Sequence, residues 1–350
     1  MCHVADDIVQ DTDSFPQASE NLLKYLLKKA GIIAPPGEIA KGRSISILDL
    51  GFGCGDQTLY LTSQLPQYVD VISYVGITLS KVQYTFAKKR VLDGLDVVDI
   101  LLDRPQSITC RQPNLDRGLN IENTPFSLAN SGQRRKGNIS LYAADASNPA
   151  SWSSSLHLSL LPALSPPTSP FSQPPTQKPS PAVPHFGKPL GLDIRDLAYE
   201  HWTLALDSLY HFRPSRVPIL KYTHDKLQSN LLIFDLLRQS SGISVTQSLF
   251  LRAFCIAASI PYHNLLTKEE YIHMLITRVG YHKEEIVIED ISDFVFPGLA
   301  GFISRRSKEM EKSGVRWRRW AGFKVVGWVV QTGLLRGGVV VARWRKTETV

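Results

Sequence analysis

The chain has 350 residues, of which 43% are hydrophobic, and a formal net charge of +7 at pH 7. A soluble chain of this length can bury a full core, as one large domain or two small ones. The four cysteines lie far apart without a Cys-x-x-Cys pair, which argues against a disulfide framework and a zinc site. The acidic N-terminus does not resemble a signal peptide, and no stretch is apolar enough to span a bilayer comfortably, so we expect a cytoplasmic protein.

The positive charge is concentrated near the C-terminus. Residues 305–346 contain twelve Lys and Arg side chains and two Glu, whereas the remainder has a small net negative charge. The basic character therefore belongs to this segment and not to the body of the chain. A solvated basic face is the expected role, with peripheral contact to a membrane surface or to nucleic acid as the alternatives.

The first part of the chain alternates predicted helices and strands. Residues 19–30 have the apolar spacing of an amphipathic helix, with Ser19 as its N-cap and Gly31 at its end. Further on, strands are expected over 44–50 and 71–77, and helices over 57–65 and 79–92. Short apolar strands that alternate with helices predict an α/β fold with a doubly wound, mostly parallel sheet.

Two insertions interrupt this pattern. Residues 103–137 are polar, and residues 162–189 contain ten of the 22 prolines, mixed with serine. Because such a segment cannot offset its ordering entropy by burial, we predict a disordered surface loop over 162–189. A binding site for a proline-reading partner is the alternative.

The remaining elements continue the alternation. Strands are expected over 139–146, 202–209, 230–236, 285–291 and 338–344, and helices over 214–228 and 267–279. Thr267 and Glu270 have the spacing of a capping box at the start of the last helix. We divide the chain into an N-terminal helical lid, residues 1–43, and a single larger domain, residues 44–350, that carries both insertions.

The most specific motif is the glycine-rich turn after the first strand, Asp49-Leu50-Gly51-Phe52-Gly53-Cys54-Gly55. Glycines allow a tight turn and the close approach of a ligand to the backbone. The turn leads into a helix N-terminus, which favours a carboxylate or phosphate group. A dinucleotide fold has the spacing G-x-G-x-x-G, whereas this turn has G-x-G-x-G preceded by Asp.

This turn resembles the cofactor loop of class I S-adenosylmethionine-dependent methyltransferases. The resemblance implies that Gly51, Gly53 and Gly55 hold the methionine end of S-adenosyl-L-methionine and that Asp49 helps to anchor its ammonium group. A glycine turn that binds no ligand is the alternative reading.

The end of the second strand is similar to the branch of that family that contains cyclopropane fatty acid synthases and small-molecule natural-product methyltransferases. The residues that carry the similarity form the run Gly76-Ile77-Thr78-Leu79-Ser80-Lys81-Val82-Gln83. The resemblance implies that Thr78 and Gln83 contact the cofactor ribose, and we include Leu79 beside them. Thr78 stands where most relatives have an acid, so the ribose contacts must be neutral hydrogen bonds. Ser80 is also suited to be the N-cap of the next helix.

The third and fourth strands complete the expected cofactor site. In the family, an acid at the position of Asp145 bonds the adenine amino group, and the amide of the next residue, here Ala146, faces an adenine nitrogen. A turn capped by the Asp145 side chain is the structural alternative. We also place Asp207, at the end of the fourth strand, in the cofactor site, because strand carboxyl ends line the ligand site of open α/β sheets.

The candidate catalytic residues follow the fourth strand and end the fifth. Tyr210-His211-Phe212 resembles a natural-product O-methyltransferase pattern, which implies that His211 lies near the acceptor and acts as a general base. Asp235 lies where relatives also carry an acid, and a carboxylate could orient the histidine ring. The alternatives are a His211 bonded to a backbone carbonyl and an Asp235 that holds a helix N-terminus. His201 and Tyr210 are weaker candidates.

The sequence thus predicts an S-adenosylmethionine-dependent methyltransferase that acts on a small organic acceptor by direct in-line transfer to O, N or C. Tyr210 replaces the glutamate of the cyclopropane branch, so we do not predict cyclopropanation. The resemblance covers roughly residues 44–345, implies a seven-stranded Rossmann-like sheet with an antiparallel last strand, and implies no metal. Residues 237–265 and the N-terminal helix are expected to cover the acceptor.

Two other functions stay open. One is a nucleic-acid or protein methyltransferase that uses the basic C-terminal segment with Trp317 and Trp320, although we expect no nucleic-acid partner. The other is a cofactor-binding module without catalytic activity. The sequence does not predict the acceptor, the methylated atom or the oligomeric state.

Overall fold

The computed structural model describes residues 14–34, 43–92, 138–160, 199–240, 242–313, 325–327, 329 and 331–345. Both predicted insertions, 103–137 and 162–189, lie outside the described residues, as do Trp317 and Trp320.

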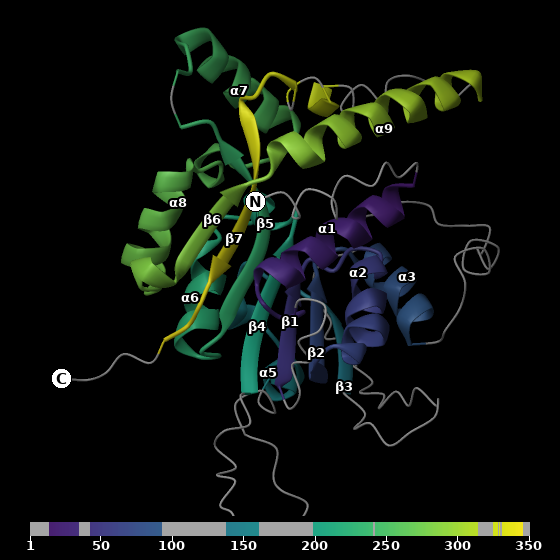
Figure 1. Cartoon of the computed structure of the whole chain (residues 1–350), viewed down its shortest axis with the longest axis vertical. Coiled ribbons are helices and arrows are strands. Elements are labelled where there is room, and N and C mark those ends of the chain that lie inside the picture. The colour runs from purple at the N-terminus through teal and green to yellow at the C-terminus, as the bar shows by residue number, and fades with distance from the viewer. Residues whose placement is uncertain are drawn as a thin grey trace, which may run out of the picture.

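The described residues form a seven-stranded sheet with the order β3-β2-β1-β4-β5-β7-β6 (Figure 1). Its strands are β1 (Ser44–Leu50), β2 (Asp70–Thr78), β3 (Asn138–Ala143), β4 (Tyr199–Leu206), β5 (Asn230–Arg238), β6 (Ile286–Asp290) and β7 (Leu335–Ala342). Strands β1 to β5 pair in parallel with their neighbours, and β7 runs antiparallel between β5 and β6. The predicted α/β fold and the antiparallel last strand are confirmed.

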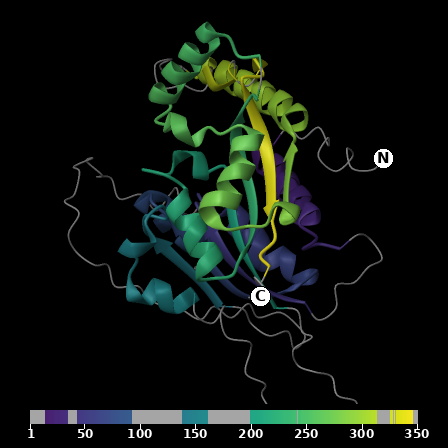
Figure 2. The same ribbon diagram turned by 90° about the vertical axis from the view of Figure 1, so that its left-hand side faces the viewer.

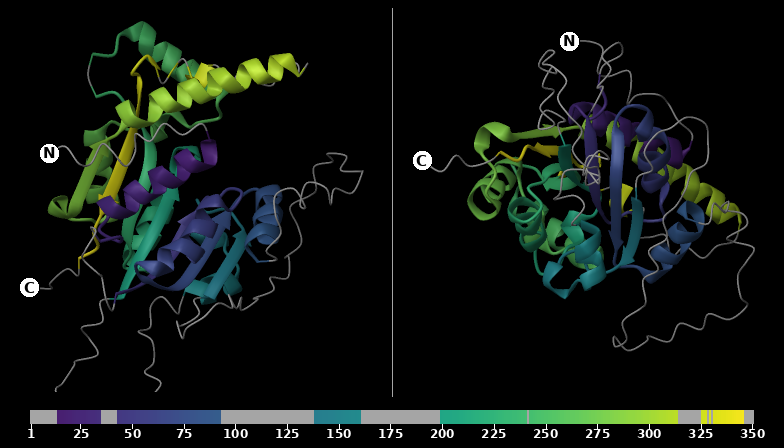
Figure 3. Two further views of the ribbon diagram at one scale, coloured as in Figure 1. Left: turned by 45° about the vertical axis from the view of Figure 1, so that its right-hand side comes forward. Right: turned by 90° about the horizontal axis from the view of Figure 1, so that it is seen from below.

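Helices cover both faces of this sheet, as Figures 2 and 3 show. One face packs against α1 (Phe15–Lys29), α2 (Asp56–Leu59) with its continuations η1 (Tyr60–Gln64) and η2 (Leu65–Gln67), and α3 (Lys81–Val91). The other packs against α5 (Ser154–Leu160), α6 (Val217–Asp225) and α8 (Lys268–Met274) with its continuation η8 (Leu275–Val279). Short helical turns are η3 (Pro149–Ser151), η6 (Leu209–His211), η7 (Tyr262–Asn264) and η9 (Lys283–Glu285), and the longer helices α7 (Val245–Ala257) and α9 (Ser292–Lys312) complete the elements.

The sequence of β1 explains why the sheet is covered on both faces. Side chains alternate along a strand, so Ile45 and Ile47 enter the core beneath α1 and α2. Leu48 and Leu50 enter the core beneath α5 and α6. A strand that is apolar on both faces must be buried on both faces, as parallel sheets require.

Helix α1 begins earlier than the sequence predicts. It starts at Phe15, and Ser14 takes the N-cap position; Ser19, the predicted cap, lies inside the helix and donates a hydrogen bond to the Phe15 carbonyl at 3.0 Å. Pro16 is compatible with a first helical turn, where its missing N–H has no partner to lose. The helix packs Leu26 and Leu27 into the core of the sheet, and its role as a lid stays a prediction.

The capping box of α8 is confirmed. The Thr267 hydroxyl accepts a hydrogen bond from the Glu270 amide at 3.2 Å, and the Glu270 carboxylate accepts one from the Thr267 amide at 2.9 Å.

Strands β4 and β3 each end three residues before their predicted boundaries. Strand β4 stops at Leu206, because Asp207 has a left-handed backbone with φ of 58° that a strand cannot continue. Strand β3 stops at Ala143, so Asp145 and Ala146 belong to the following turn.

Helices α7 and α9 lie near the carboxyl end of β5, at the top of Figure 1. No described helix is both long enough and apolar enough to cross a membrane.

Candidate functional site

The turns that follow β1 to β5 meet at one edge of the sheet, which we call the carboxyl edge. Hydrogen bonds join the turns after β1, β3 and β4 to a neighbouring strand. The Gly51 amide donates to the Ile77 carbonyl at 2.7 Å, and the Ala144 amide donates to the Thr78 carbonyl at 3.0 Å. The Asp207 amide donates to Phe234 in the same way at 2.9 Å. The structure therefore brings most of the predicted site residues together.

The three glycines of the first turn have different surroundings. A Cβ atom on Gly51 would lie 2.7 Å from the Ser208 Cβ, and one on Gly55 would lie 3.1 Å from the Ala87 Cβ. Gly53 has a φ of 60°, and no described atom lies within 4 Å of the position its Cβ would take. Gly51 and Gly55 thus allow close packing of the protein on itself, whereas Gly53 leaves space that a ligand can approach.

Asp49 lies beneath this turn and is 0% exposed. Both carboxylate oxygens accept hydrogen bonds from the Gln57 amide nitrogen at 2.8 Å, and one also accepts from the Tyr74 hydroxyl at 2.6 Å. The Tyr74 hydroxyl lies 2.8 Å from the Thr58 hydroxyl. Burial raises the pKa of Asp49 to about 6, against the opposing effect of these donors.

Gln57, Tyr74 and Thr58 were not selected from the sequence. A buried acid needs donors, so the position of Asp49 in an apolar strand indicates that some must exist. It does not say which, because Tyr74 reaches Asp49 only through the register that pairs β1 with β2.

The residues after β2 also contact one another. The Thr78 hydroxyl donates to the Gln83 side-chain carbonyl at 2.9 Å. The Ser80 hydroxyl accepts from the Gln83 amide at 3.3 Å, so Ser80 is the N-cap of α3, as the structural alternative predicts. Leu79 is 75% exposed at this edge. The proximity of Thr78 and Gln83 is observed, and their contact with a ribose stays a prediction.

The turn after β3 is organised by the Asp145 side chain. Its Oδ1 accepts hydrogen bonds from the Ser147 amide at 2.8 Å and from the Ser147 hydroxyl at 2.7 Å. The turn-capping alternative therefore describes one role of Asp145. The side chain is nevertheless exposed, whereas Ala146 is buried, and the adenine contact stays a prediction.

Strand β4 delivers Asp207, Tyr210 and His211 to the carboxyl edge. The Tyr210 hydroxyl donates to the Asp207 carboxylate at 2.8 Å, and the rings of Tyr210 and His211 are 4.4 Å apart. Asp207 is open to solvent on one side, yet the surrounding protein desolvates it and raises its pKa to about 6. Its left-handed backbone is the kind of local strain that clusters at functional sites.

His211 is exposed, and its imidazole is biased toward the neutral form. Partial burial lowers its pKa, and the positive charge of Arg213 lowers it further; a hydrogen bond with the Ser259 backbone opposes both effects. The backbone partner matches the structural alternative for this histidine, while a neutral ring is also what a general base requires.

Asp235 is held by Arg216 and Tyr271. It is 0% exposed, forms a buried ion pair with Arg216, and accepts a hydrogen bond from the Tyr271 hydroxyl at 3.2 Å. Arg216 is the N-cap residue of α6, so Asp235 holds the start of a helix, as its structural alternative predicts. The described partners of Asp235 therefore do not include the His211 ring that it was predicted to orient.

Asp235 is instead connected to the backbone around His211. Arg216 also donates to the Asn264 carbonyl. The Asn264 side chain in turn donates to the carbonyls of Tyr210 at 3.3 Å and Phe212 at 2.7 Å. These contacts hold the backbone of the η6 turn in place. Sequence reasoning missed Arg216 and Asn264, since neither belongs to a strand-end motif.

The segment 237–265, predicted to cover the acceptor, is divided between core and surface. Phe254 and Ile260 join Tyr210 in a small buried cluster. Leu249 and Ile256 are 62% and 81% exposed. Only some of the apolar residues of this segment therefore face the protein, and these pack beside Tyr210.

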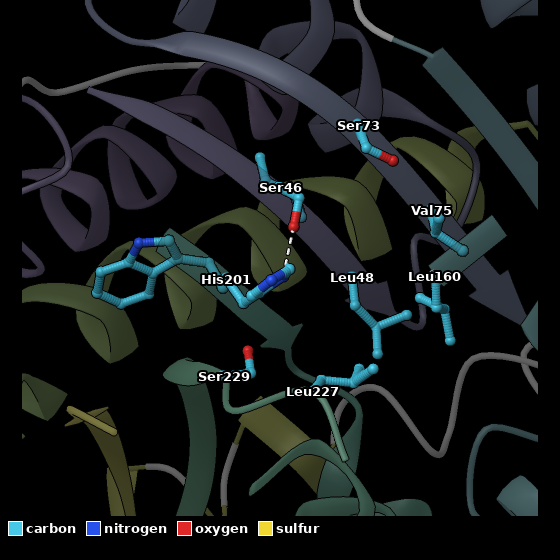
Figure 4. A pocket seen from close by; sticks show the side chains of 10 residues that line it. Ser46, Leu48, Ser73, Val75, Leu160, His201, Leu227 and Ser229 are labelled. Atoms are coloured by element: carbon cyan, nitrogen blue, oxygen red, sulfur yellow. Dashed lines mark hydrogen bonds between the residues drawn. The ribbon is translucent and has the colours of Figure 1, made fainter. Parts of the chain in front are cut away.

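His201 lies in β4, partly buried beside a small cavity (Figure 4). Its Nδ1 is 2.7 Å from the Ser46 hydroxyl, and burial lowers its pKa to about 4. The small cavity beside it is lined by residues of β1, β2 and β4, including Ser46, Ser73 and Trp202. Because these residues precede the ends of their strands, the geometry gives His201 no part in the strand-end site.

No family model matches the chain, and no curated protein matches it. Among solved structures, the chain is similar to the cyclopropane synthase MmaA2 from Mycobacterium tuberculosis, with 12% identity and a TM-score of 0.52 over 96% of this chain and 88% of that one. It is also similar to a protein assigned as a sarcosine dimethylglycine methyltransferase from Galdieria sulphuraria, with 12% identity and a TM-score of 0.51 over 94% and 88%. The chain therefore has the Rossmann-like fold of class I S-adenosylmethionine-dependent methyltransferases.

Proposed function

We propose that the protein binds S-adenosylmethionine at the carboxyl edge and transfers its methyl group to a small organic acceptor. The observation that carries this proposal is the turn after β1, where Gly53 alone among the three glycines leaves open space. Thr78 ends β2, and Asp145 lies in the turn after β3, at the same edge. One elongated ligand can thus contact three consecutive strand ends.

The proposed cofactor site extends from β1 to β4. The turn that contains Gly51, Gly53 and Gly55 holds the methionine portion above Asp49. Thr78, Leu79 and Gln83 hold the ribose, and the turn of Asp145 and Ala146 holds the adenine. Asp207 closes the site on the side of β4, where its charge favours the cationic sulfonium group.

The acceptor is proposed to bind beside Tyr210 and His211, beneath the cluster of Phe254 and Ile260. Bound S-adenosylmethionine supplies an electrophilic methyl group, so the protein contributes mainly alignment of the two reactants. A neutral His211 accepts the proton of a hydroxyl or amine acceptor. The contacts of Asp235, Arg216 and Asn264 keep the His211 turn in place.

Small acceptors are the class we propose, because the Tyr210 ring, 4.4 Å from the His211 ring, belongs to an apolar cluster with Phe254 and Ile260. One of the matches, with a TM-score of 0.51, is named as a sarcosine dimethylglycine methyltransferase, and small acceptors of that kind support the same class.

Thermal unfolding with S-adenosylhomocysteine, the demethylated product, tests the proposal first. A ligand that binds only the folded state stabilises it, by about 2.7 kcal/mol at a hundredfold excess over Kd. We expect a clear rise in melting temperature at millimolar concentration, followed by labelled methyl transfer in a screen of small acceptors. No shift with either S-adenosylmethionine or its product contradicts the proposal, and a shift without transfer to any acceptor favours the non-catalytic binding module.

A further inference from the structure

Asp49 is closed off from any ligand by its own hydrogen-bond partners. It is 0% exposed, and its oxygens are occupied by the Gln57 amide nitrogen at 2.8 Å and the Tyr74 hydroxyl at 2.6 Å. A ligand ammonium cannot touch this carboxylate while Gln57 stays in place. The direct contact that the family resemblance implies for Asp49 is therefore blocked in this arrangement.

Gln57 connects the buried charge to the surface. A carboxylate only accepts hydrogen bonds, so the Gln57 amide must turn its NH2 group toward Asp49 and its carbonyl oxygen away from it. The side chain is half-buried, and no residue within the described ranges donates a hydrogen bond to its Oε1. Asp49 thus fixes the orientation of the Gln57 side-chain amide, and the Oε1 oxygen can accept a hydrogen bond from a ligand.

The charge balance around Asp49 specifies the kind of donor. Gln57, Tyr74 and, behind Tyr74, Thr58 are all neutral. Neutral donors solvate an ionised carboxylate but leave its net charge in place. A cation on the outer side of Gln57 would gain both a hydrogen bond and the attraction of the charge behind it. Gln57 lies in α2, directly after the turn that contains Gly53, and Gly53 is the glycine of that turn that leaves open space.

We infer that Gln57, and not Asp49, receives the α-ammonium group of the cofactor, and that Asp49 is a positioning residue that fixes the Gln57 amide. This inference rests on the proposed function, since it names the contact by which the proposed site recognises the amino-acid end of its ligand.

Calorimetric titration of the full chain with two ligands tests it. One ligand is S-adenosylhomocysteine, and the other is its desamino analogue, in which hydrogen replaces the α-amino group. The unmodified protein should bind the first about tenfold more tightly, which is the scale of one hydrogen bond to a charged group. Gln57→Met keeps the length of the side chain and removes its carbonyl, so the ratio should fall to about twofold or less. Gln64→Met, at an exposed position in η1, should keep the tenfold ratio.

The outcomes separate the inference from the proposed function. Gln57→Met with an undiminished ratio, or an unmodified protein that binds both ligands equally, overturns the inference and leaves the proposed function standing. An unmodified protein that binds neither ligand overturns both. Gln57→Ala replaces Gln57→Met if the latter does not fold. Asp49→Asn provides a second readout. An Asn at this position can donate as well as accept, so the Gln57 side-chain amide is free to turn over, and the affinity ratio of the two ligands should also fall.

Discussion

Asp49 on β1 and Asp235 on β5 are two fully buried carboxylates of the same sheet, and their partners differ in charge. Asp49 is held by the neutral side chains of Gln57 and Tyr74. Asp235 forms an ion pair with Arg216 and a hydrogen bond with Tyr271. The charge of Asp235 is balanced inside the fold, whereas that of Asp49 is not.

This difference shows that a place on a sheet strand does not by itself make an acid part of a ligand site. Both residues fit a strand-end motif in the sequence. The charge of the buried partner distinguishes them. The positive charge of Arg216 indicates a structural role for Asp235, whereas the neutral partners of Asp49 leave a negative charge that a cationic ligand can use. The following changes test that distinction, from the largest expected effect to the smallest.

Replacement of Arg216 should have the largest effect, and on stability. Arg216→Met leaves the Asp235 carboxylate buried without its counter-charge, which should lower the free energy of unfolding by about 3–5 kcal/mol. Chemical denaturation measures this loss. Arg213→Met is the matched control: Arg213 is exposed and donates a hydrogen bond to the Ser259 carbonyl at 3.2 Å, so the change should stay within about 0.5 kcal/mol. If the two variants were equally stable, Asp235 would not be the structural member of the pair.

His211→Ala tests the catalytic side of the comparison. Loss of a general base typically lowers turnover by about 100-fold or more. The affinity for S-adenosylhomocysteine should be nearly unchanged, because the proposed cofactor contacts lie on β1 to β4 before His211. Steady-state turnover on an acceptor from the screen provides the measurement.

His263→Ala is the control for this histidine. His263 is exposed and contacts the Pro214 carbonyl at 2.6 Å, so its loss should leave turnover close to that of the unmodified protein. Equal turnover for His211→Ala and His263→Ala removes His211 from the mechanism.

Gly53→Val tests whether the open space beside Gly53 is part of the cofactor site. A side chain there fills that space and is strained by the positive φ, at a cost of about 1–2 kcal/mol. We expect cofactor affinity to fall by more than about tenfold. Gly333→Val has a similar strain, with φ of 72° and no described atom within 4 Å, in the turn before β7, where no cofactor contact is proposed. It should lose stability but keep cofactor affinity, and retained binding by Gly53→Val contradicts the loop assignment.

The pH dependence of binding should show the smallest effect. Burial raises the pKa of Asp49 to about 6, so its charge is lost as pH falls through that value. Affinity for S-adenosylhomocysteine, measured calorimetrically, should weaken up to about fourfold from about pH 7.5 to about pH 5.5. Asp49→Asn should remove most of this dependence, and an unchanged pH profile in that variant assigns the titration to another group.

The same pKa shift has the opposite consequence for stability. The folded pKa of about 6 lies above the ordinary aspartate value of 3.8, so the folded state binds this proton more readily than the unfolded state. Its unfavourable contribution is complete above about pH 6 and disappears as pH falls toward 3.8. Weaker binding at low pH is therefore not a sign of unfolding at Asp49.

Much of the fold could be predicted from the sequence because its signals are local. The alternation of Ile45, Ile47, Leu48 and Leu50 predicts a strand that is covered on both faces, and the spacing of Thr267 and Glu270 predicts a helix start. Where local signals conflicted with local geometry, the prediction was wrong: the apolar run through Leu209 continues past β4, but the left-handed backbone of Asp207 ends the strand.

The candidate site was predictable only in part, for a related reason. Gly53 and Thr78 belong to compact motifs, and the structure places both at one edge. The partners that decide what a carboxylate does come from distant segments: Tyr74 reaches Asp49 across a strand pair, and Asn264 reaches the His211 turn from another loop. Such contacts depend on strand register and on the packing of distant turns, which no local pattern encodes.

A crystal structure of the protein with S-adenosylhomocysteine tests the central claim most directly, because it shows which groups surround the ligand ammonium. Our account predicts the ligand along the ends of β1 to β3, with its amino nitrogen within hydrogen-bond distance of the Gln57 Oε1 and Asp49 still buried behind it. A ligand bound away from the Gly53 turn, or one whose ammonium contacts Asp49 directly with Gln57 displaced, contradicts it.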